Sequence, residues 1–589
     1  MSIALITWGR FFDKQGNKIT VPAPNTDPDK PWPWDFLCSE VSEMGHHFDA
    51  LQLPSASKCL GGSGAGCDGY GIFDLRDLGS KKQQGSIPTR YGTKKSLLQA
   101  IAMAHANGMD VWLDIGLHQL MGENGGPGVF RYLGADGKTQ NGRGATTPGW
   151  FRGNTGNNDP VPPFCLEDEV PNVFFDFPFG REKSFQHCNP RRITIEDALD
   201  FGDWLFRSTG ADAARFDDVK GTWAPFVAEF MNTGTMRNKA FYSEYFEGNP
   251  DTLNWWSTSG PMYSRSSVED FTTHWAIQSA CDGGNLWPLH RGGFFTWHPE
   301  LSVPFVDNPD TDTSPGQQVM NSKLLGYAYL LTVPCRMALV YGKDYFGGDV
   351  WPGSYGLKKW IDNLCWISRK LAFGAYNVPY GDEKAIVIQR NGQGGSVGHS
   401  PGLLTAINFD TWSPKKVTVQ TVFWPGTHLH DFTGRHHDIW CDGQGRATFT
   451  IPSNAFSHGQ SYLCFSWAGM EGSAIEIHTR PTTQTIIGAP DLDVPPAGPT
   501  DTPVGSVFAA EDSQISLTLD LPKEFASEHV VVTLTAPSGL KETKEMVDGD
   551  HYKSVPTQES GEVVISVMTR GPELPFELQV TYTAPRGLQ

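Results

Sequence analysis

The sequence predicts an α/β barrel of the (β/α)8 type that carries a small inserted domain and is followed by an antiparallel β domain and an extra β-sandwich. Three observations lead to this prediction. Helix-like and strand-like segments alternate over the first part of the chain, a long stretch rich in Gly, Pro and Asn interrupts them, and short alternating strands follow after about residue 381. Such alternation is typical of a parallel sheet with crossover helices, and here it is long enough for eight units.

The helix-then-strand order is clearest at three places. A helical pattern over Leu97–Asn107 ends at Gly108, which suits a C-cap, and the apolar run Met109–Leu117 follows it. The same order returns at Ile195–Ser208 with Ala211–Phe216, and at Ser322–Thr332 with Met337–Tyr341. We therefore assign residues 1–118 and 191–380 to the barrel.

The interrupting stretch covers residues 119–190, between the second and third barrel-like units. Connections of this length without secondary structure of their own are uncommon in compact domains. We therefore expect a small inserted domain there.

The rest of the chain indicates two β domains joined by a linker. Residues 381–470 contain the segments AIVIQ, LLTAINF, KVTVQTVFW, RATFTI and YLCFSW. Residues 471–504 predict the linker, and residues 505–589 contain the short strands of a β-sandwich. All 19 Trp residues lie at or before Trp467. The last domain is therefore either a spacer or a carbohydrate-binding module, with Tyr552 or Tyr582 as candidate sugar platforms.

The composition excludes some classes of partner. The formal net charge is −19, whereas a nucleic-acid-binding protein needs a basic face. The most apolar stretch, Leu324–Tyr341, is interrupted by Pro334 and Arg336, so no segment is predicted to span a membrane. No signal peptide is visible, and we expect a secreted or periplasmic protein from which such a signal has been removed. Neutral polysaccharides and small molecules remain as ligands.

The ten cysteines form an even count without the CxxC spacing of a zinc or thioredoxin site. One interpretation is a set of local disulfides among the close pairs Cys59/Cys67, Cys165/Cys188 and Cys441/Cys464. The other is a reduced protein, because a scattered even count also occurs in reduced proteins.

Ordered motifs in the first 380 residues resemble those of one enzyme family. They are LPSASKCLGGSGAGCDGYGIFDLRDLG, TRYGTKKSLLQAIAMAHANGMDVWLDIGLH, GADAARFDDVKG, FYSEYFEGNPDTLNWW, FVDNPDTDT and MALVYGKDYF. In these motifs and in their order the chain resembles the bacterial liquefying α-amylases of glycoside hydrolase family 13. The resemblance implies the same barrel, the family's C-terminal domain up to about residue 469, and a hydrolase acting on α-glucan.

The candidate nucleophile is Asp217. It follows the strand-like run AARF, which places it at the carboxyl end of a barrel strand, where such barrels build their sites. Arg215 lies two residues earlier and points to the same side of the strand, so charge pairing can hold the carboxylate ionised. A surface Asp–Arg pair is the alternative. The family pattern makes Asp217 the nucleophile and Arg215 its partner.

Retaining glycoside hydrolysis needs a second carboxyl group about 5–5.5 Å from the first. Glu244 follows the strand-like run KAFYS and has the aromatic neighbours Tyr242, Tyr245 and Phe246. Spacing alone does not separate Glu244 from Glu247. The family pattern makes Glu244 the general acid/base.

The third carboxylate comes from the motif FVDNPD. Spacing alone leaves Asp307 and Asp310 open. The family pattern makes Asp310 the residue that bonds the sugar hydroxyls while the glycosyl ring distorts.

Further positions match residues that bind the sugar in the family. The resemblance implies that Tyr70 stacks on the sugar in the cleaved subsite and that Asp114 steadies the site. Lys220 would line the leaving-group side of the site. The alternatives without a role in binding are core packing for Tyr70 and a solvated surface charge for Lys220. Trp255 and Trp256 are either stacking platforms for further glucose units or packing residues.

Three positions depart from the family. Gln119 and Pro309 stand where the family has histidines that bond the sugar in the cleaved subsite, and Gly221 stands where it has another. Gln119 can still donate a hydrogen bond, whereas Pro309 has no side-chain donor. A charge-assisted hydrogen bond is worth about 1.5–3 kcal/mol. The departures therefore imply modest activity or a different preferred sugar or linkage.

The same region bears on calcium. The family's ion is ligated partly by an Asn that His118 replaces here. Calcium prefers oxygen ligands, and imidazole is a poor one. Asp168 and Asp176 in the inserted segment are further candidate ligands, and we keep calcium as the expected ion.

The leading interpretation is a retaining hydrolase of starch-like α-glucan that cleaves α-1,4-glucosidic bonds through a covalent glycosyl-enzyme. The first alternative is a transglycosylase of the same fold, whose site residues would be identical. The second is a non-catalytic α-glucan-binding protein with a decayed site. The missing imidazoles favour that second alternative, whereas the three carboxylates and Arg215 argue against it.

Overall fold

We describe a computed structural model of the chain. It describes residues 1–12, 18–21, 33–64, 66–117, 119–120, 131–133, 139–141, 177–178, 193–222, 224–259, 262–347, 355–392, 402–455, 459–488, 494–571 and 574–588. The described residues divide into two compact units. Unit 1 consists of Met1–Phe11, His47–Ala50 and Tyr242–Glu476, and unit 2 consists of Phe12–His46, Leu51–Phe241 and Ile477–Gln589.

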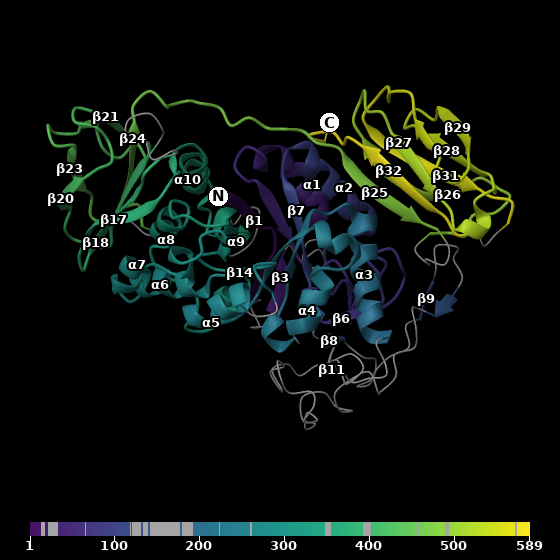
Figure 1. Ribbon diagram of the computed structural model, residues 1–589, viewed down its shortest axis with the longest axis horizontal. Coiled ribbons are helices and arrows are strands. Elements are labelled where there is room, and N and C mark those ends of the chain that lie inside the picture. The colour runs from purple at the N-terminus through teal and green to yellow at the C-terminus, as the bar shows by residue number, and fades with distance from the viewer. Residues whose placement is uncertain are drawn as a thin grey trace. The chain divides into compact units, whose positions relative to one another are not determined.

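Eight strands form one sheet in the order β15-β14-β13-β12-β7-β4-β1-β16. Their bounds are β1 Ser2–Ile6, β4 Ala50–Leu53, β7 Asp110–Ile115, β12 Ala213–Phe216, β13 Ala240–Ser243, β14 Ser267–Glu269, β15 Ser302–Val303 and β16 Met337–Tyr341. The pairs β1–β16 and β12–β7 are parallel. A parallel bridge joins Phe305, beyond β15, to Leu339 of β16. The prediction of a (β/α)8, or TIM, barrel is confirmed as a nearly closed barrel of eight strands. Strands β1, β7 and β14 of this barrel are labelled in Figure 1.

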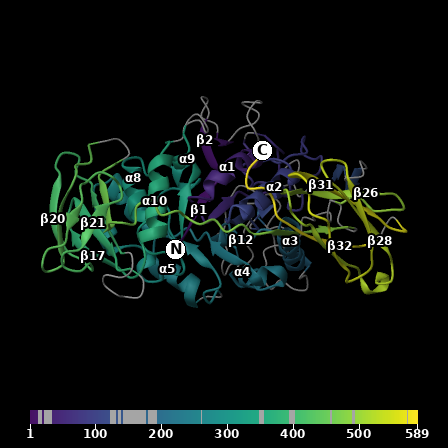
Figure 2. The ribbon, with the colours of Figure 1, turned by 90° about the horizontal axis from the view of Figure 1, so that it is seen from above.

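The helices of the barrel region are α1 Pro33–Met44, α2 Lys94–Ala106, α3 Ile193–Thr209, α4 Ala224–Met231, α5 Pro250–Asn254, α6 Phe271–Cys281, α7 Trp287–Arg291, α8 Lys323–Leu330, α9 Gly342–Tyr345 and α10 Lys358–Leu371. Within unit 1, α10 lies beside α8 and α9 (Figure 2). Helix α2 begins with a capping box between Thr93 and Ser96. It ends before Gly108, whose φ of 75° is the left-handed conformation expected of a C-cap glycine.

Short strands accompany the barrel. They are β2 Gly9–Phe12, β3 Lys18–Val21, β5 Lys58–Cys59, β6 Ile72–Asp74, β8 Gln119–Leu120, β9 Arg131–Leu133, β10 Thr139–Asn141 and β11 Phe177–Pro178. The last four fall in the predicted inserted domain, most of which lies outside the described residues.

The antiparallel β domain of unit 1 contains the five predicted strand segments. One sheet has the order β17-β18-β19-β24-β21-β22, and β20 pairs with β23. The bounds are β17 Tyr376–Gly381, β18 Ala385–Arg390, β19 Leu403–Asn408, β20 Lys415–Gln420, β21 His428–Asp431, β22 Ile439–Trp440, β23 Arg446–Ile451 and β24 Tyr462–Trp467. In β23 the residues alternate between buried and exposed, as expected for a sheet with one solvated face.

The last domain is a sandwich of two four-stranded sheets with the orders β25-β32-β27-β30 and β26-β31-β28-β29. The bounds are β25 Thr482–Ile487, β26 Thr502–Ala509, β27 Ser516–Asp520, β28 Val530–Thr535, β29 Lys541–Met546, β30 His551–Lys553, β31 Gly561–Met568 and β32 Glu577–Tyr582. The sandwich therefore begins earlier than predicted, because β25 lies inside the stretch 471–504 that we assigned to a linker.

Within unit 2 the sandwich is attached to the barrel helices by polar contacts. His105, in the last turn of α2, bonds to Oγ1 of Thr482 through Nδ1 at 2.6 Å and to Asp212 through Nε2 at 2.9 Å. Arg480, just before β25, pairs with both oxygens of Asp212 at 2.7 and 2.8 Å. Burial alone would raise the pKa of Asp212, but the hydrogen bonds from His105 and Arg480 outweigh it and hold that pKa well below its usual value.

We expect Arg480→Met to lower the free energy of unfolding by about 1–2 kcal/mol at pH 7, because Asp212 loses a charged partner at a partly exposed position. A carboxyl group with a lowered folded pKa stabilises the fold above its unfolded pKa of about 4, and that stabilisation is lost as the pH falls below this value. The difference between wild type and variant in urea denaturation should therefore stay constant from pH 7 to about pH 4 and shrink as the pH falls further, towards about pH 2. The matched control is Arg446→Met, which removes an exposed pair with Asp442 and should cost less than about 0.5 kcal/mol. Equal losses in the two variants would contradict the expected role of Arg480.

The structure also bears on the predictions about disulfides and about membrane-spanning segments. The eight described cysteines are free thiols, so neither Cys59/Cys67 nor Cys441/Cys464 forms a disulfide, while Cys165 and Cys188 lie outside the described residues. Among the described helices, none combines the length and the apolar character that a membrane span requires.

Candidate active site

Asp217 is the first residue after β12 and lies against Arg215 of the same strand. The Arg215 guanidinium donates to Oδ1 of Asp217 at 2.7 Å and to both carboxylate oxygens of Asp114 at 3.0 and 2.8 Å. The side chains of Arg215 and Asp114 are 4% and 0% exposed, whereas that of Asp217 is 16% exposed. Arg215 thus joins the carboxyl ends of β7 and β12, and Asp217 is the more accessible of the two carboxylates.

Asp114, on β7, is surrounded by hydrogen-bond donors from other elements. Its Oδ2 accepts from the Tyr70 hydroxyl at 2.8 Å and from Nε2 of Gln52 at 3.3 Å, besides Arg215. Burial, and then the charge of Asp114, raises the pKa of Tyr70 well above its usual value, so the hydroxyl stays a donor. A buried carboxylate is tolerated when it is paired and hydrogen-bonded. Asp114 is therefore a fixed anchor for Arg215.

The backbone around Asp217 fixes its position further. The Asp217 amide donates to the carbonyl of Ile115 on β7 at 2.9 Å. The next residue, Asp218, has a φ of 41°, so the chain turns sharply away immediately after the strand. Asp217 therefore sits at the tip of a strand whose end is tied to its neighbour.

Glu244 is the first residue after β13 in unit 1. It is buried, with 9% of its surface exposed. The neighbouring aromatic side chains are packed, since the ring centroids of Tyr245 and Trp256 lie 5.2 Å apart and those of Phe246 and Phe271 lie 4.6 Å apart. The carboxyl group is thus held at a strand end in a largely desolvated position.

Asp310 lies in a turn that Asn308 organises. Oδ1 of Asn308 accepts from the backbone amides of Asp310 at 3.0 Å and of Thr311 at 2.9 Å. The Thr311 hydroxyl donates to Oδ1 of Asp307 at 3.0 Å. The side chain of Asp307 is fully buried, whereas that of Asp310 is 39% exposed. The turn therefore directs one carboxylate inward and leaves the other accessible.

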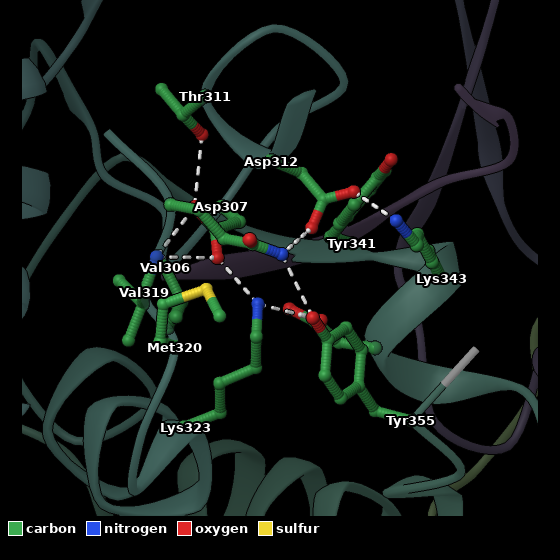
Figure 3. Close-up of polar contacts among 12 residues, drawn as sticks. Val306, Asp307, Thr311, Asp312, Val319, Met320, Lys323, Tyr341, Lys343 and Tyr355 are labelled. Atoms are coloured by element: carbon green, nitrogen blue, oxygen red, sulfur yellow. Dashed lines mark hydrogen bonds and ion pairs between the residues drawn. The ribbon is translucent and has the colours of Figure 1, made fainter. Parts of the chain in front are cut away.

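A buried charge cluster lies behind this turn (Figure 3). Lys323 pairs with Asp307 and, at 2.9 Å, with Asp344, and all three side chains are fully buried. The Tyr327 hydroxyl donates to Asp344 at 2.7 Å. Burial raises the pKa values of Asp307 and Asp344, and the charge of Lys323 opposes that rise. Asp307, the local alternative to Asp310, is therefore part of a buried structural cluster.

The other alternative, Glu247, has a local role. Its Oε1 accepts from the backbone amide of Asn249 at 3.1 Å, two residues along. Asn249 in turn caps α5 by accepting from the amide of Asp251. Glu247 thus stabilises the turn that leads into α5.

The structure adds Arg10, which the sequence analysis did not identify. Arg10 lies on β2, directly after the end of β1, and its guanidinium pairs with the Asp310 carboxylate. Its side chain is 11% exposed and packs over the ring of Trp8, 5.2 Å from the centroid. Pro309, the neighbour of Asp310, is buried and offers no side-chain donor. In this chain Pro309 stands at the position of a histidine in the family. The cationic donor beside Asp310 is instead the Arg10 guanidinium.

Comparisons with known proteins show which enzymes the chain resembles. The chain is 26% identical over 399 residues to an α-amylase of Geobacillus stearothermophilus, covering 59% of this chain and 69% of that protein. It is 24% identical over 484 residues to a glucan 1,4-alpha-maltohexaosidase of Bacillus sp. (strain 707), covering 72% and 86%, and 24% identical over 469 residues to an α-amylase of Bacillus licheniformis, covering 72% and 89%. The chain is a homologue of bacterial α-amylases.

Solved structures with the same fold include two further α-amylases. The enzyme of Geobacillus thermoleovorans, solved in complex with acarbose, superposes with a TM-score of 0.56 at 16% identity, over 79% of this chain and 97% of that chain. An Anoxybacillus α-amylase superposes with a TM-score of 0.53 at 15% identity, over 80% and 99%. No protein-family model matches the sequence.

The remaining predicted sugar-binding residues of this α-amylase homologue differ in how exposed they are. Trp256 is 1% exposed and packs on Tyr245, so it cannot act as an open stacking platform, and the packing alternative holds for it. Trp255 is 45% exposed and stays a candidate. Lys220 is half-buried in a 3-10 turn over Val219–Gly221.

His118, Asp168 and Asp176, the predicted calcium ligands, lie outside the described residues. Gln119 belongs to β8, which pairs with β11, but its side chain is likewise outside the described part.

Proposed function

We propose that this protein is a retaining α-glucan hydrolase that acts on α-1,4-glucosidic bonds. The observation that supports this most is the clamp of Arg215 on Asp217 and Asp114, because it holds an accessible carboxylate ionised at a barrel strand end. The names of the homologous α-amylases supply the substrate class.

In the first half of the reaction, one Asp217 oxygen attacks the anomeric carbon as the glycosidic bond breaks. Glu244 transfers its proton to the departing glycosidic oxygen, so the leaving chain departs as a neutral alcohol. The hydrogen bond from Arg215 to Oδ1 keeps Asp217 ionised and oriented.

In the second half, Glu244 is ionised and removes a proton from a water molecule. The resulting hydroxide attacks the same carbon and releases Asp217, which restores both groups and gives a product with the original α configuration. Asp310 accepts hydrogen bonds from sugar hydroxyls while the ring is distorted. A sugar alcohol in place of water would give transglycosylation with the same residues.

The test is a reducing-end assay on soluble starch combined with proton NMR of the first product. The proposal expects new reducing ends and an initial excess of the α anomer. An initial excess of the β anomer would overturn retention, and a protein that binds starch without releasing reducing ends would support the non-catalytic alternative. Products longer than the supplied oligosaccharide would indicate the transglycosylase.

Glu244→Gly is expected to lose hydrolysis of starch and to regain turnover of an activated α-glucosyl fluoride or aryl glycoside when azide is added. The reason is that such leaving groups need no proton, while azide replaces the water that Glu244 would deprotonate. The measurement is release of fluoride or phenol with and without azide.

The matched control for Glu244→Gly is Glu247→Gln, which removes a carboxylate three residues away that caps a turn. We expect it to retain most activity on starch. Loss of activity in Glu247→Gln, together with no azide rescue in Glu244→Gly, would transfer the acid/base role to Glu247.

Arg10→Met is expected to lower kcat on starch by about 10–100-fold with a smaller change in KM, because one charge-assisted bond to Asp310 is worth about 1.5–3 kcal/mol. Arg10→Lys keeps the charge and should recover part of the loss. A KM that rises while kcat stays constant would instead make Arg10 a general sugar-binding residue.

Calcium and secretion remain predictions. The candidate ligands His118, Asp168 and Asp176 lie outside the described residues, so the structure offers no geometry for the ion. We propose calcium at that site on the resemblance alone. A loss of thermal stability on dialysis against a chelator, reversed by added calcium, would support it.

A further inference from the structure

A line of aromatic rings crosses the antiparallel β domain of unit 1, away from the residues assigned to catalysis. It begins at Trp440 of β22, which is 60% exposed and pairs with His428 of β21. The two rings stack almost in parallel, with centroids 4.4 Å apart and planes inclined by 3°. Stacking on His428 fixes the orientation of the indole and leaves a large flat surface open to solvent.

The line continues along β21. His430 lies on the same side of the strand as His428, since residues two apart share a face. Both imidazoles contact Asp438, at 2.6 and 2.7 Å. The His430 ring meets Phe432 edge to face at 5.0 Å.

The line ends on α10. Phe432 stacks with Trp366 at 5.4 Å and 27°, and Asn363 of the same helix donates to the Phe432 carbonyl at 3.0 Å. The Trp366 indole nitrogen donates to the carbonyl of Ser473 at 2.9 Å. We call the five rings of Trp440, His428, His430, Phe432 and Trp366 the β21 strip, and β21 and α10 are labelled in Figure 1.

An open groove lies at the α10 end of the β21 strip. It has a volume of about 600 Å³ and is lined by Trp360, Trp366, Phe432, and by polar side chains that include Asn363, Arg435 and Glu471. Its walls therefore combine flat apolar rings with carboxylate, amide and guanidinium groups, and binding sites for small molecules typically have this composition.

We propose that the β21 strip and its groove bind α-glucan at a second site, separate from the catalytic carboxylates. The proposal rests on the proposed function for the identity of the glucan. A glucose ring presents an apolar face of C–H bonds and a rim of hydroxyl groups, so a short chain of sugars matches flat rings that alternate with hydrogen-bonding groups. The strip extends about 13 Å along β21 from His428 to Phe432, which spans more than one sugar unit.

Other occupants fit the β21 strip less well. A nucleic acid would be repelled by Asp438 and Glu471 and by the net charge of −19. An apolar helix of a partner protein would bury these carboxylates and imidazoles without partners, which is costly. A neutral, hydroxyl-rich ligand avoids both costs.

The last sandwich is the other candidate for glucan binding, through Tyr582 and Tyr552. Tyr582 is 2% exposed and its hydroxyl donates to Gln484, so it belongs to the core. The Tyr552 hydroxyl is engaged with Glu542. Tyr582 is therefore too buried to act as a sugar platform, and the Lys544 ammonium lies over the Tyr552 ring, 5.8 Å from its centroid.

The test uses the full-length chain with Asp217→Asn, so that no glucan is consumed, and compares migration in native gels with and without amylopectin. Trp440→Ala in this background is expected to weaken retardation by amylopectin about threefold to tenfold, in line with the loss of one well-placed aromatic contact. His428→Ala, which removes the ring that orients Trp440, should weaken it less. Trp366→Ala removes the other end and serves as a second, independent variant.

The matched control is Trp412→Ala. Trp412 is 89% exposed in the same domain, in the turn after β19, and does not belong to the strip. It should leave retardation unchanged. Equal retardation of the Trp440→Ala and Trp366→Ala proteins and their parent would overturn the proposal, as would an equal loss in Trp412→Ala.

A second readout separates this proposal from the proposed function. In the otherwise wild-type chain, Trp440→Ala should keep kcat/KM on a short soluble oligosaccharide and lose rate on starch granules. If the wild-type chain neither cleaves nor is retarded by amylopectin, the proposed function itself fails. If it cleaves soluble starch and the Trp440→Ala chain degrades granules as fast as wild type, only the second site fails.

Discussion

Asp217→Asn is expected to lower kcat on soluble starch by about 10⁴-fold or more, while the protein stays folded and still binds glucan. The substitution is isosteric, but an amide oxygen is a far weaker nucleophile than a carboxylate, and losses of this size follow when a nucleophile is removed. Arg215 would keep its bonds to Asp114, so the strand ends remain tied. The measurement is reducing-end release, with circular dichroism and amylopectin retardation as checks on folding and binding.

Asp218→Asn is the matched control for Asp217→Asn. Asp218 has a φ of 41°, a conformation that Asn tolerates as well as Asp does. We expect activity within about threefold of wild type. More than about 1% residual activity in Asp217→Asn would remove Asp217 from the role of nucleophile.

Lys323→Met is expected to produce the largest loss of stability, about 3–5 kcal/mol in the free energy of unfolding. Lys323 is the cation shared by Asp307 and Asp344, and all three side chains are fully buried. Removing one partner of a buried ion pair leaves the other charge without compensation, and here two carboxylates are affected. Urea denaturation at pH 7, followed by tryptophan fluorescence, measures the loss.

The double variant Lys323→Met/Asp307→Asn is the control for Lys323→Met. Neutralising Asp307 removes one of the two uncompensated charges, so part of the lost stability should return, as expected of coupled neighbours. Additive losses in the double variant would show that Lys323 and Asp307 do not act as a pair. Lower activity in Lys323→Met at temperatures where it is folded would indicate that the turn carrying Asp310 also depends on the cluster.

Local patterns in the sequence predicted much of the barrel and the placement of its carboxylates. Asp217 and Glu244 each follow a short apolar strand, and the strand boundaries in the structure end one residue before each of them. Gly108 marked the end of α2 for a similar reason, since a left-handed C-cap depends on the residue itself. Choosing Asp310 over Asp307 needed the family pattern, because both sit in the same turn and differ only in burial.

Features that depend on distant segments were missed. Arg10 pairs with a residue 300 positions along the chain, and nothing near Arg10 in the sequence indicates that contact. The one available signal was its place after the first barrel strand. Strand β25 was assigned to a linker because its pairing with β32, about 95 residues away, is the reason that TTQTII becomes a strand. The difference between Trp255 and Trp256 likewise depends on which ring meets Tyr245.

The position of β32 in its sheet has a consequence for how the chain folds during synthesis. β32, the last strand among the described residues, lies between β25 and β27, and β25 packs against α3 and α2. Until residues 577–582 have left the ribosome, β25 has no partner along that edge and the outer surfaces of these two helices have no completed sheet over them. Non-local strand pairing of this kind is slow and exposes unpaired edges. A chain that stops before residue 577 should therefore lose the pairing of β25, and we expect unit 2 as a whole to be destabilised.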